Sequence, residues 1–454
     1  MSAYFNGLNQ KLFSALPARA RSVLELGCAN GRLGAKYKQS HPETRWTGIE
    51  ISTDAAREAA HHLDAVHVMD VESDNLSALP GGYDLVVLGD LLEHMKNPER
   101  LLERLFDMTS ETASMVICLP NMGHVSVLHR LLAGDISYDD AGLLDRTHLR
   151  FYSASSAFKT ILDAGWLPDL RDTYDVPIAE NKTDQLIMMA AESMGLPSAT
   201  ARRNLSTYQM VIQCTKWPLE NITNIDKPER FSVIVPVTRP WQTELNIKRS
   251  PGLAEVQAEV ICITNAANAA EAYAKGRHMA KHPWVIFAHQ DVYFPTGTGY
   301  AIAKQLGRLT RERKTAAPAG FAGLSRNSLD GTSTPAGLVI DRTHLFNHPA
   351  SHSACSLDEF AIAIHHDAHI SIDPELGWHL WATDLCLQHN IPPHAAPQIL
   401  RVPLFHNSTT AHSLPQEFEA SAKILAIKYP TLGKIPTLCG TIQTESNLHS
   451  THPV

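Results

Sequence analysis

The sequence predicts two α/β domains in tandem, and three observations lead to this expectation. The chain has 454 residues, whereas a single hydrophobic core stops growing at roughly 250–300 residues. Two separate stretches alternate short apolar, β-rich runs with helix-like segments, a pattern typical of parallel sheets covered on both faces. The polar segment PLENITNIDKPER, which carries two prolines, separates them. We therefore expect domains at residues 1–217 and 231–454, joined by a linker over 218–230.

The first alternation runs from Ser22 to about Val116. Its expected strands are SVLELG, RWTGIEI, AVHVMDV, YDLVVLG and ASMVICLP, and its expected helices include DAAREAAHHL and NPERLLERLFDMT. DQLIMMAAE and YQMVIQCTKW are predicted to be further strands or closing elements of the same domain. The second alternation begins at Phe231, with strands RFSVIVPV, AEVICITNA and PWVIFAHQDV and the helix NAAEAYAKGRHMAKH.

The composition is that of a soluble globular protein, with 44% hydrophobic and 19% charged residues. A net charge of −8 argues against a nucleic-acid partner held through backbone phosphates. Seven cysteines without a CxxC pair favour a reduced, cytoplasmic compartment. No run approaches the roughly 20 apolar residues of a membrane span, and no apolar signal core stands near Met1. We therefore expect a cytoplasmic protein without a membrane span.

Four successive strand ends in the first half carry residues suited to a nucleoside. In VLELGCANGRLG, Gly27 and Gly31 allow a sharp turn and a close approach of the backbone to a ligand. Glu50 ends the second strand, where a carboxylate can accept hydrogen bonds from both hydroxyls of a ribose. Asp70 with Val71 ends the third strand and suits the amine and face of an adenine. Asp90 ends the fourth, and ligands of such sheets lie across these ends.

These motifs resemble those of class I S-adenosylmethionine-dependent methyltransferases. The resemblance covers about residues 20–190 and includes ELGCANG, GIEIS, MDV, DLLEHMKNPERLL and LLDRTHLRFYSASSAFKTILDAGW. Ala29 stands where many members have a second glycine, and the turn lacks the GxGxxG spacing of a nicotinamide site. The resemblance implies a Rossmann-like sheet that binds S-adenosylmethionine. It implies a cofactor site made of Glu25, Gly27, Cys28, Gly31, Glu50, Ile51, Asp70, Val71 and Asp90.

The candidate residues on the side of the methyl acceptor are His94, His148 and Asp145. Transfer from a sulfonium needs in-line geometry more than an acid or base, but a hydroxyl acceptor would also want a base. Each histidine could instead cap or pack at a strand end. We predict that His94 or His148 faces the acceptor as a catalytic residue.

The stretch VIFAHQDVYFP places Asp291 just after four apolar strand residues. A carboxylate in that setting, with no basic neighbour in sequence, commonly meets a metal or a cation from elsewhere. Mg²⁺ and Mn²⁺ prefer oxygen ligands and bridge to phosphates, and a neighbouring imidazole would favour Mn²⁺. Asp384 is expected at the start of an amphipathic helix, where a carboxylate can also be a structural cap. His406 ends the apolar run RVPLF.

This half resembles nucleotide-sugar-dependent glycosyltransferases of the family 2-like type with the GT-A fold, in the bacterial subgroup with a histidine–glutamine–aspartate element. The resemblance covers about residues 230–412 and rests on FSVIVPV, ICITN and EAYAKGRHMAKHPWVIFAHQDVYFP. It implies that Asp384 is the catalytic base and that Asp291 and His406 bind a divalent metal, Mn or Mg. It implies donor-binding residues Pro236, Val237, Asn265, His289, Gln290 and Asp291. It implies acceptor-side residues Asp358, Glu359, His379 and Trp381.

Two departures from that family affect the expected chemistry. His289 replaces the first acid of the usual Asp-x-Asp, so the metal is bound weakly unless His406 compensates. Asn265 stands where an aspartate is common, which leaves the base of the nucleotide open. A single base acting in a direct displacement predicts inversion of the anomeric centre.

The sequence thus predicts a bifunctional enzyme of glycan or cell-surface polysaccharide biosynthesis. One half would transfer a methyl group, and the other would transfer a sugar from a nucleotide-sugar donor to a glycan or glycosylated small-molecule acceptor. One alternative keeps an active methyltransferase beside a non-catalytic sugar-nucleotide-binding or docking domain. Another is a non-catalytic scaffold that senses S-adenosylmethionine.

Overall fold

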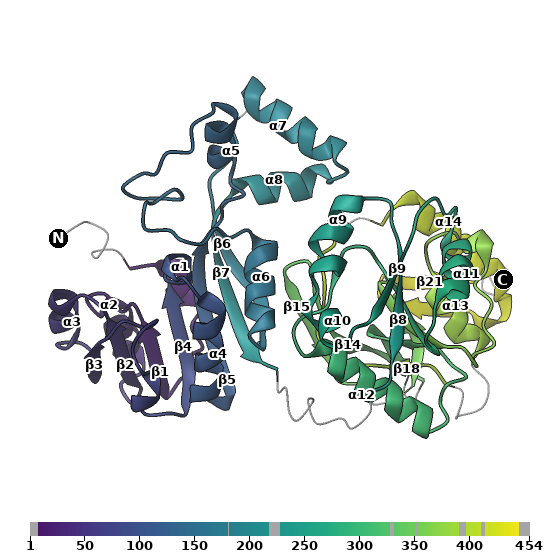
Figure 1. Ribbon diagram of the computed structural model, residues 1–454, viewed down its shortest axis with the longest axis horizontal. Helices are drawn as coiled ribbons and strands as arrows, with labels where there is room; N and C mark the ends of the chain where they lie inside the picture. The colour runs from purple at the N-terminus through teal and green to yellow at the C-terminus, as the bar shows by residue number, and fades with distance from the viewer. Residues whose placement is uncertain are drawn as a thin grey trace, which may run out of the picture. The chain divides into compact units, whose positions relative to one another are not determined.

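The computed structural model describes residues 8–179, 181–217, 228–326, 331–350, 353–389, 396–409 and 414–444. The chain divides into two compact units, Met1–Leu219 and Glu220–Val454 (Figure 1). This division falls within the segment expected to be the linker, of which residues 218–227 lie outside the described residues. No helix in the described ranges has the length and apolar character that crossing a membrane requires.

The first unit is built on one seven-stranded sheet with the strand order β3-β2-β1-β4-β5-β7-β6. Its strands are β1 (Ser22–Leu26), β2 (Arg45–Glu50), β3 (Ala65–Val68), β4 (Tyr83–Gly89), β5 (Thr109–Pro120), β6 (Trp166–Asp175) and β7 (Thr207–Lys216). Strands β1 to β5 are parallel, and β7 runs antiparallel between β5 and β6. The strand order reverses between β1 and β4, which is where sheets of this kind bind ligands.

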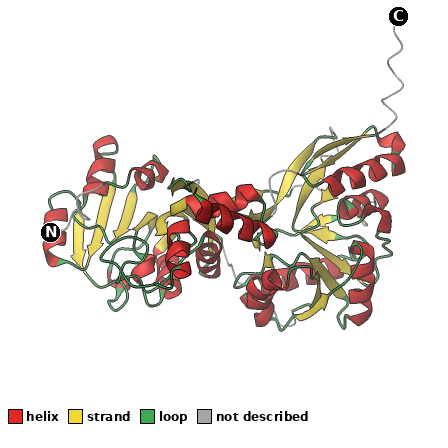
Figure 2. Ribbon diagram, turned by 90° about the horizontal axis from the view of Figure 1, so that it is seen from above, coloured by secondary structure: helices red, strands yellow, loops and turns green. Residues whose placement is uncertain are grey.

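Helices lie on both sides of this sheet (Figure 2). The helices of this unit are α1 (Gln10–Ala15), α2 (Arg32–Ser40), α3 (Thr53–Ala59), α4 (Pro98–Met108), α5 (Val125–Leu132), α6 (Ala154–Asp163), α7 (Lys182–Ser193) and α8 (Ser198–Ser206). Helix α4 shows why the sequence forms them: Pro98 occupies its first turn, and Leu101, Leu102 and Leu105 bury one face. The expected strands, and the helices predicted at α3 and α4, are therefore confirmed.

The segment DQLIMMAAE corrects the sequence-based prediction, because it lies in helix α7 and is not a strand. The side chain of Asn181 accepts the backbone N–H of Asp184 and starts the helix. Met188 then packs with Val125 of α5 and Leu205 of α8 in a small apolar cluster. These three helices stand together beside the sheet (Figure 1). The second predicted element, YQMVIQCTKW, forms β7 as expected.

The second unit is a mixed α/β structure with two larger sheets and a small hairpin. The first sheet has the order β18-β12-β17-β10-β8-β9 and the second the order β11-β19-β14-β13-β16, with β15 paired to β14. The strands are β8 (Phe231–Pro236), β9 (Glu259–Ile263), β10 (Trp284–Ala288), β11 (Val292–Tyr293), β12 (Ala319–Gly320), β13 (Ala322–Arg326), β14 (Ser333–Asp341), β15 (His344–His348), β16 (Ala354–Leu357), β17 (Ala361–His365), β18 (Gln398–Ile399), β19 (Leu404–His406), β20 (Lys434–Thr437) and β21 (Gly440–Gln443).

The helices of this unit are α9 (Pro240–Leu245), α10 (Pro251–Glu255), α11 (Ala269–Met279), α12 (Thr298–Arg311), α13 (Trp381–Gln388) and α14 (Gln416–Lys428). The three predicted strands β8, β9 and β10 are present and parallel, and the predicted helix is α11. Helix α10 lies so close to α12 that a Cβ atom added to Gly299 would be 1.8 Å from the carbonyl oxygen of Gly252.

This close approach predicts that Gly299→Ala destabilises the second unit by roughly 1–3 kcal/mol, because an added methyl group forces the backbone of α10 and α12 apart. Calorimetric unfolding of the full chain measures the effect. Lys304→Ala, an exposed change in the same helix, is the control. An equal free energy of unfolding for the two variants would show that the helices tolerate the extra methyl group.

Candidate functional sites

A cavity of about 780 Å³ lies in the first unit where the turns after β1, β2, β3 and β4 meet. Its volume suits a ligand of nucleoside size, since small-molecule sites typically span about 300–1,000 Å³. The expected cofactor residues gather around it. The lining includes Glu25, Gly27, Cys28, Glu50, Ile51, Asp70, Val71 and Asp90. Gly31 does not line it, but its N–H donates to the Cys28 carbonyl at 2.8 Å and closes the turn.

The turn after β1 is held in shape by Glu50. Gly27, Ala29 and Gly31 have φ angles of 71°, 47° and 75°, so Ala29 adopts the left-handed conformation at the position of a family glycine. The Ala29 N–H donates to Oε2 of Glu50 at 2.9 Å, and the Ser52 N–H donates to Oε1 at 2.9 Å. Each carboxylate oxygen retains a lone pair for a further donor, so the turn and the acid form one preorganised wall.

Glu25 is a buried carboxyl group beside this turn, with 6% of its surface exposed. Burial raises its pKa to about 8, although the indole Nε1–H of Trp46 donates to Oε2 at 2.8 Å and lowers it, and the Glu50 charge adds to the rise. The sequence did not single out Trp46. A carboxyl group poised in this way gains charge most readily beside a cationic ligand.

The pKa values of the two aspartates that follow β3 and β4 are shifted in opposite directions. Asp70 accepts the Glu72 backbone N–H at 3.0 Å and the Ser73 hydroxyl at 2.9 Å, and these bonds hold its pKa below the usual value. Burial raises the pKa of Asp90 to about 6, and its Oδ1 accepts a hydrogen bond from Nε2 of Gln209 at 2.9 Å. Gln209 comes from β7, a strand the sequence did not connect with the site.

His94 and His148 lie side by side at the Asp90 end of the cavity. Their ring centroids are 4.9 Å apart in an edge-to-face arrangement. His94 lines the cavity with Thr147, whereas His148 is buried. Burial lowers the pKa of His94, which favours its neutral form. Asp145 accepts the N–H of Thr147 at 2.8 Å and supports this loop. Whether either histidine meets the acceptor stays a prediction.

The second unit contains a cavity of about 640 Å³. It collects several polar side chains at the end of β10, in the β16–β17 connection and at the end of β19. Of the predicted residues, the lining includes His289, Asp291, Asp358, Glu359, His379 and His406.

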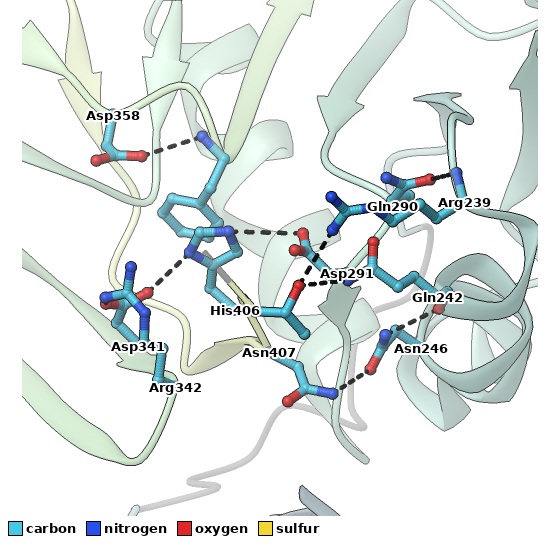
Figure 3. Close-up of polar contacts among 12 residues, drawn as sticks. Arg239, Gln242, Asn246, Gln290, Asp291, Asp341, Arg342, Asp358, His406 and Asn407 are labelled. Carbon is cyan, nitrogen blue, oxygen red and sulfur yellow. Dashed lines mark hydrogen bonds and ion pairs between the residues drawn. The ribbon is translucent and has the colours of Figure 1, made fainter. Parts of the chain in front are cut away.

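His406 lies between two carboxylates, as Figure 3 shows. Its Nδ1 is 2.9 Å from Oδ1 of Asp341, and its Nε2 is 3.5 Å from Oδ1 of Asp291. Burial by itself would lower the pKa of His406, but the two carboxylates raise it to about 10. Burial likewise opposes ionisation of Asp291, but the His406 charge lowers its pKa to about 2. No sequence pattern pointed to Asp341. Only the pairing of β14 with β19 places it beside His406.

His289 completes a group that fits a divalent metal ion. One ligand atom each from His289, Asp291 and His406 lies within 4.8 Å of the others. Burial lowers the pKa of His289 to about 4, so its imidazole is neutral. Oδ1 of Asp291 is buried, and its contact with Nε2 of His406 is a long ion pair of 3.5 Å. Two imidazoles and a carboxylate are suitable donors for Mn²⁺ once the proton on Nε2 of His406 has left.

The prediction that Asp384 is a catalytic base is wrong in its placement. Its side chain is fully buried and is not among the residues that line the cavity. Oδ2 accepts hydrogen bonds from Lys428 at 2.9 Å and Gln388 at 2.7 Å, and Oδ1 accepts one from the Tyr429 hydroxyl at 2.7 Å. These contacts make Asp384 a structural link between α13 and α14.

The prediction that Trp381 lies on the acceptor side is also wrong, because its side chain packs into the core. Its ring lies 5.3 Å from that of Phe287 and only 1% of its surface is exposed. Glu359 and Asp358 instead face the cavity. Burial and the Asp358 charge raise the pKa of Glu359 to about 8, although the Leu380 N–H donates to its Oε1.

The remaining expected donor residues lie outside the cavity lining. Gln290 braces the turn after β8, because its Oε1 accepts the backbone N–H of Arg239 at 2.8 Å. Val237 donates its N–H to the Ile263 carbonyl at 2.8 Å, and Asn265 has a φ of 57°. Within the described part of the chain, the cavity lining excludes Pro236, Val237, Asn265 and Gln290.

Comparison with known proteins finds similarity to methyltransferases in the first part of the chain. Residues 3–166 match the family model described as "Methyltransferase domain". The ubiquinone biosynthesis O-methyltransferase of Psychrobacter arcticus is 24% identical over 156 residues, which are 32% of this chain and 59% of that protein. The chain therefore matches little more than half the length of this curated relative.

Solved structures of low sequence identity also match. A SAM-dependent methyltransferase from Archaeoglobus fulgidus is 18% identical, with a TM-score of 0.34, over 47% of this chain and 97% of that one. A SAM-dependent methyltransferase from Thermotoga maritima, described as a possible histamine N-methyltransferase, is 16% identical, with a TM-score of 0.32, over 46% and 86%. The plantazolicin methyltransferase BpumL, solved with SAH, is 16% identical, with a TM-score of 0.30, over 45% and 80%.

The raised pKa of Glu25 predicts a pH-dependent stability. The folded state holds the proton of Glu25 up to about pH 8, whereas the unfolded chain releases it near its ordinary value of 4.5. This contribution to the free energy of unfolding is therefore present below pH 4.5 and is lost as the pH rises to about 8. Glu25→Gln lacks the effect, so its melting temperature relative to the wild type should rise across that window. The exposed Glu43→Gln is the control, and a constant difference would contradict the assignment.

Proposed function

We propose that the first unit transfers a methyl group from S-adenosylmethionine to a hydroxyl group of an acceptor. The observation that carries this proposal is the convergence of eight expected cofactor residues on one cavity at the reversal of the strand order. The family-model match over residues 3–166 supports it independently.

The residues divide the binding of S-adenosylmethionine among them. The left-handed turn at Gly27 and Ala29 leaves the backbone open to close approach, and Glu50 accepts the ribose hydroxyls. Asp70 and Val71 receive the adenine. Glu25 gains charge beside the cationic end of the cofactor. The bound cofactor supplies a methyl group on a positively charged sulfur, which makes the methyl carbon electrophilic.

The acceptor is proposed to enter at the Asp90 end of the cavity, where His94 and Thr147 line it. A neutral His94 is a suitable base for a hydroxyl proton, because burial keeps its pKa low. The curated relative is described as an O-methyltransferase of ubiquinone biosynthesis, which supports an oxygen acceptor. The acceptor class proposed for this chain is a hydroxyl on a small molecule or glycan.

Glu50→Gln should weaken binding of S-adenosylhomocysteine by about tenfold or more. One carboxylate oxygen becomes an amide NH₂ group, which cannot accept the hydrogen bond from the N–H of Ala29 or of Ser52, so the turn is distorted. Isothermal titration calorimetry measures the dissociation constant. Asp54→Asn, an exposed change in α3, is the matched control. An unchanged constant for Glu50→Gln would remove Glu50 from the proposed cofactor site.

A second candidate function, glycosyl transfer from a nucleotide sugar, is proposed for the second unit. The observation that favours it is the group of His289, Asp291 and His406, which lie together in one cavity. A bound divalent ion would offset the charge of the departing diphosphate. Glu359 is the better candidate for the base, since it lines the cavity and its raised pKa suits proton abstraction near pH 8.

Together, the two proposals describe a bifunctional enzyme that modifies one glycan or glycosylated metabolite. The alternative is an active methyltransferase whose second unit binds a sugar nucleotide or docks a partner without turnover. Hydrolysis of nucleotide sugars in the presence of Mn²⁺ separates these two possibilities, because a docking unit leaves the donor intact.

Asp291→Ala should abolish the stabilisation that a nucleoside diphosphate gives in the presence of Mn²⁺, since it removes the carboxylate of the cluster. A thermal-shift panel of UDP, GDP, CDP and dTDP, with and without Mn²⁺, measures this. Glu419→Ala, at an exposed position in the same unit, is the control. Equal stabilisation of wild type and Asp291→Ala would remove the metal from the proposal.

A further inference from the structure

Beside the proposed cofactor cavity, Glu93, His94 and His148 form a second group of possible metal ligands. One donor atom from each lies within 4.8 Å of the other two. We propose that these three residues bind a divalent transition-metal ion that holds the hydroxyl of the methyl acceptor. The metal site stands on its own geometry, and its role rests on the proposed methyl transfer.

Both histidines present the nitrogen that a metal needs. Nδ1 of His94 lies 3.1 Å from the Thr147 carbonyl oxygen, and Nδ1 of His148 lies 3.0 Å from the Leu143 carbonyl oxygen. A carbonyl oxygen can only accept, so Nδ1 carries the hydrogen in each neutral ring. Each Nε2 therefore keeps its lone pair. Metal-binding histidines usually donate their other ring N–H to a carbonyl or carboxylate in this way, which fixes the tautomer.

Glu93 supplies the negative charge. Only 1% of its surface is exposed, and its Oε2 is buried without a hydrogen-bond partner in the described part of the chain. A buried carboxylate left in this state is costly, and a bound cation would satisfy it.

The two segments that carry the ligands are tied together before any ion binds. The Leu149 N–H and the Arg150 N–H both donate to the Glu93 carbonyl, at 2.7 and 2.9 Å. With the His94–Thr147 bond, these contacts fix the loop of His148 against the 3₁₀ turn Leu92–His94. Such preorganisation lowers the cost of gathering three ligands from distant parts of the sequence.

Two imidazoles and one carboxylate are the ligand set of catalytic rather than structural metal sites, which leave a position for water or substrate. Zn²⁺, Co²⁺ and Mn²⁺ all accept this set. The open position would face the cavity, because His94 lines it whereas Glu93 and His148 are buried behind.

The ion would act on the acceptor. A hydroxyl bound to it loses its proton to water more readily, as metal-bound oxygen acids do. The acceptor oxygen then forms a bond with the methyl carbon while the carbon–sulfur bond breaks and leaves its electron pair on sulfur. With an ion bound, Nε2 of His94 would bind the metal in place of the role of base proposed above, and water would take the hydroxyl proton.

Cobalt binding tests the site. Metal-stripped full-length protein carrying Asp291→Ala, which removes the cluster in the second unit, is titrated with Co²⁺ and followed by calorimetry and visible absorption. We expect at least one bound ion, and one whose binding depends on Glu93, His94 and His148. Adding His94→Ala, His148→Ala or Glu93→Gln should weaken binding at least about tenfold, and adding the exposed His62→Ala should not. Azide should change the Co²⁺ spectrum through the open position.

Three outcomes would overturn the proposal: no Co²⁺ bound by the Asp291→Ala protein, equal binding after the three ligand changes, or loss of the same size from His62→Ala. An azide-insensitive spectrum would overturn the acceptor-facing position. Stabilisation by S-adenosylhomocysteine, measured on every variant, reports whether the first unit folds. If the wild type also lacks that stabilisation, the proposed methyl transfer fails, while the metal result stands separately.

Discussion

The carboxyl ends of parallel strands meet at one edge of a sheet, and the candidate site of the first unit depends on this constraint. In the first unit it brings the turns after β1 to β4 around one cavity, although they are spread from Glu25 to Asp90 in sequence. Glu50 turns this convergence into a defined surface, because its two oxygens hold the turn after β1 and the start of α3 in place. In the second unit the end of parallel strand β10 delivers His289 and Asp291.

The two clusters of histidine and carboxylate differ in the groups that their histidine Nδ1 atoms contact. His406 lies between Asp291 and Asp341 and holds a proton, so an ion entering that site must displace the proton first. His94 and His148 each donate Nδ1–H to a backbone carbonyl and keep Nε2 open. The partner of Nδ1, a carboxylate or a carbonyl, therefore decides how readily each cluster accepts a metal.

Local patterns predicted most strand ends but few side-chain directions. Asp291 and Glu50 were found because each follows an apolar run whose end must emerge from the sheet. Asp384 was correctly expected in the first turn of a helix, yet Lys428 and Tyr429 of a later segment turn that side into the core. Asp341 and Gln209 had no sequence signal, because strand pairing alone brings them to the sites.

By itself, the sequence determined two α/β halves, the order of their first strands and the nucleoside-suited residues at the ends of β1 to β4. These features follow from hydrophobic period and turn chemistry, which act over a few neighbouring residues. Only the tertiary structure decided that α7 is a helix, that Asp384 is a buried anchor and that Glu93 joins His94 and His148. Those outcomes depend on contacts between segments distant in sequence, such as the Leu149 and Arg150 N–H groups on the Glu93 carbonyl, which no local pattern encodes.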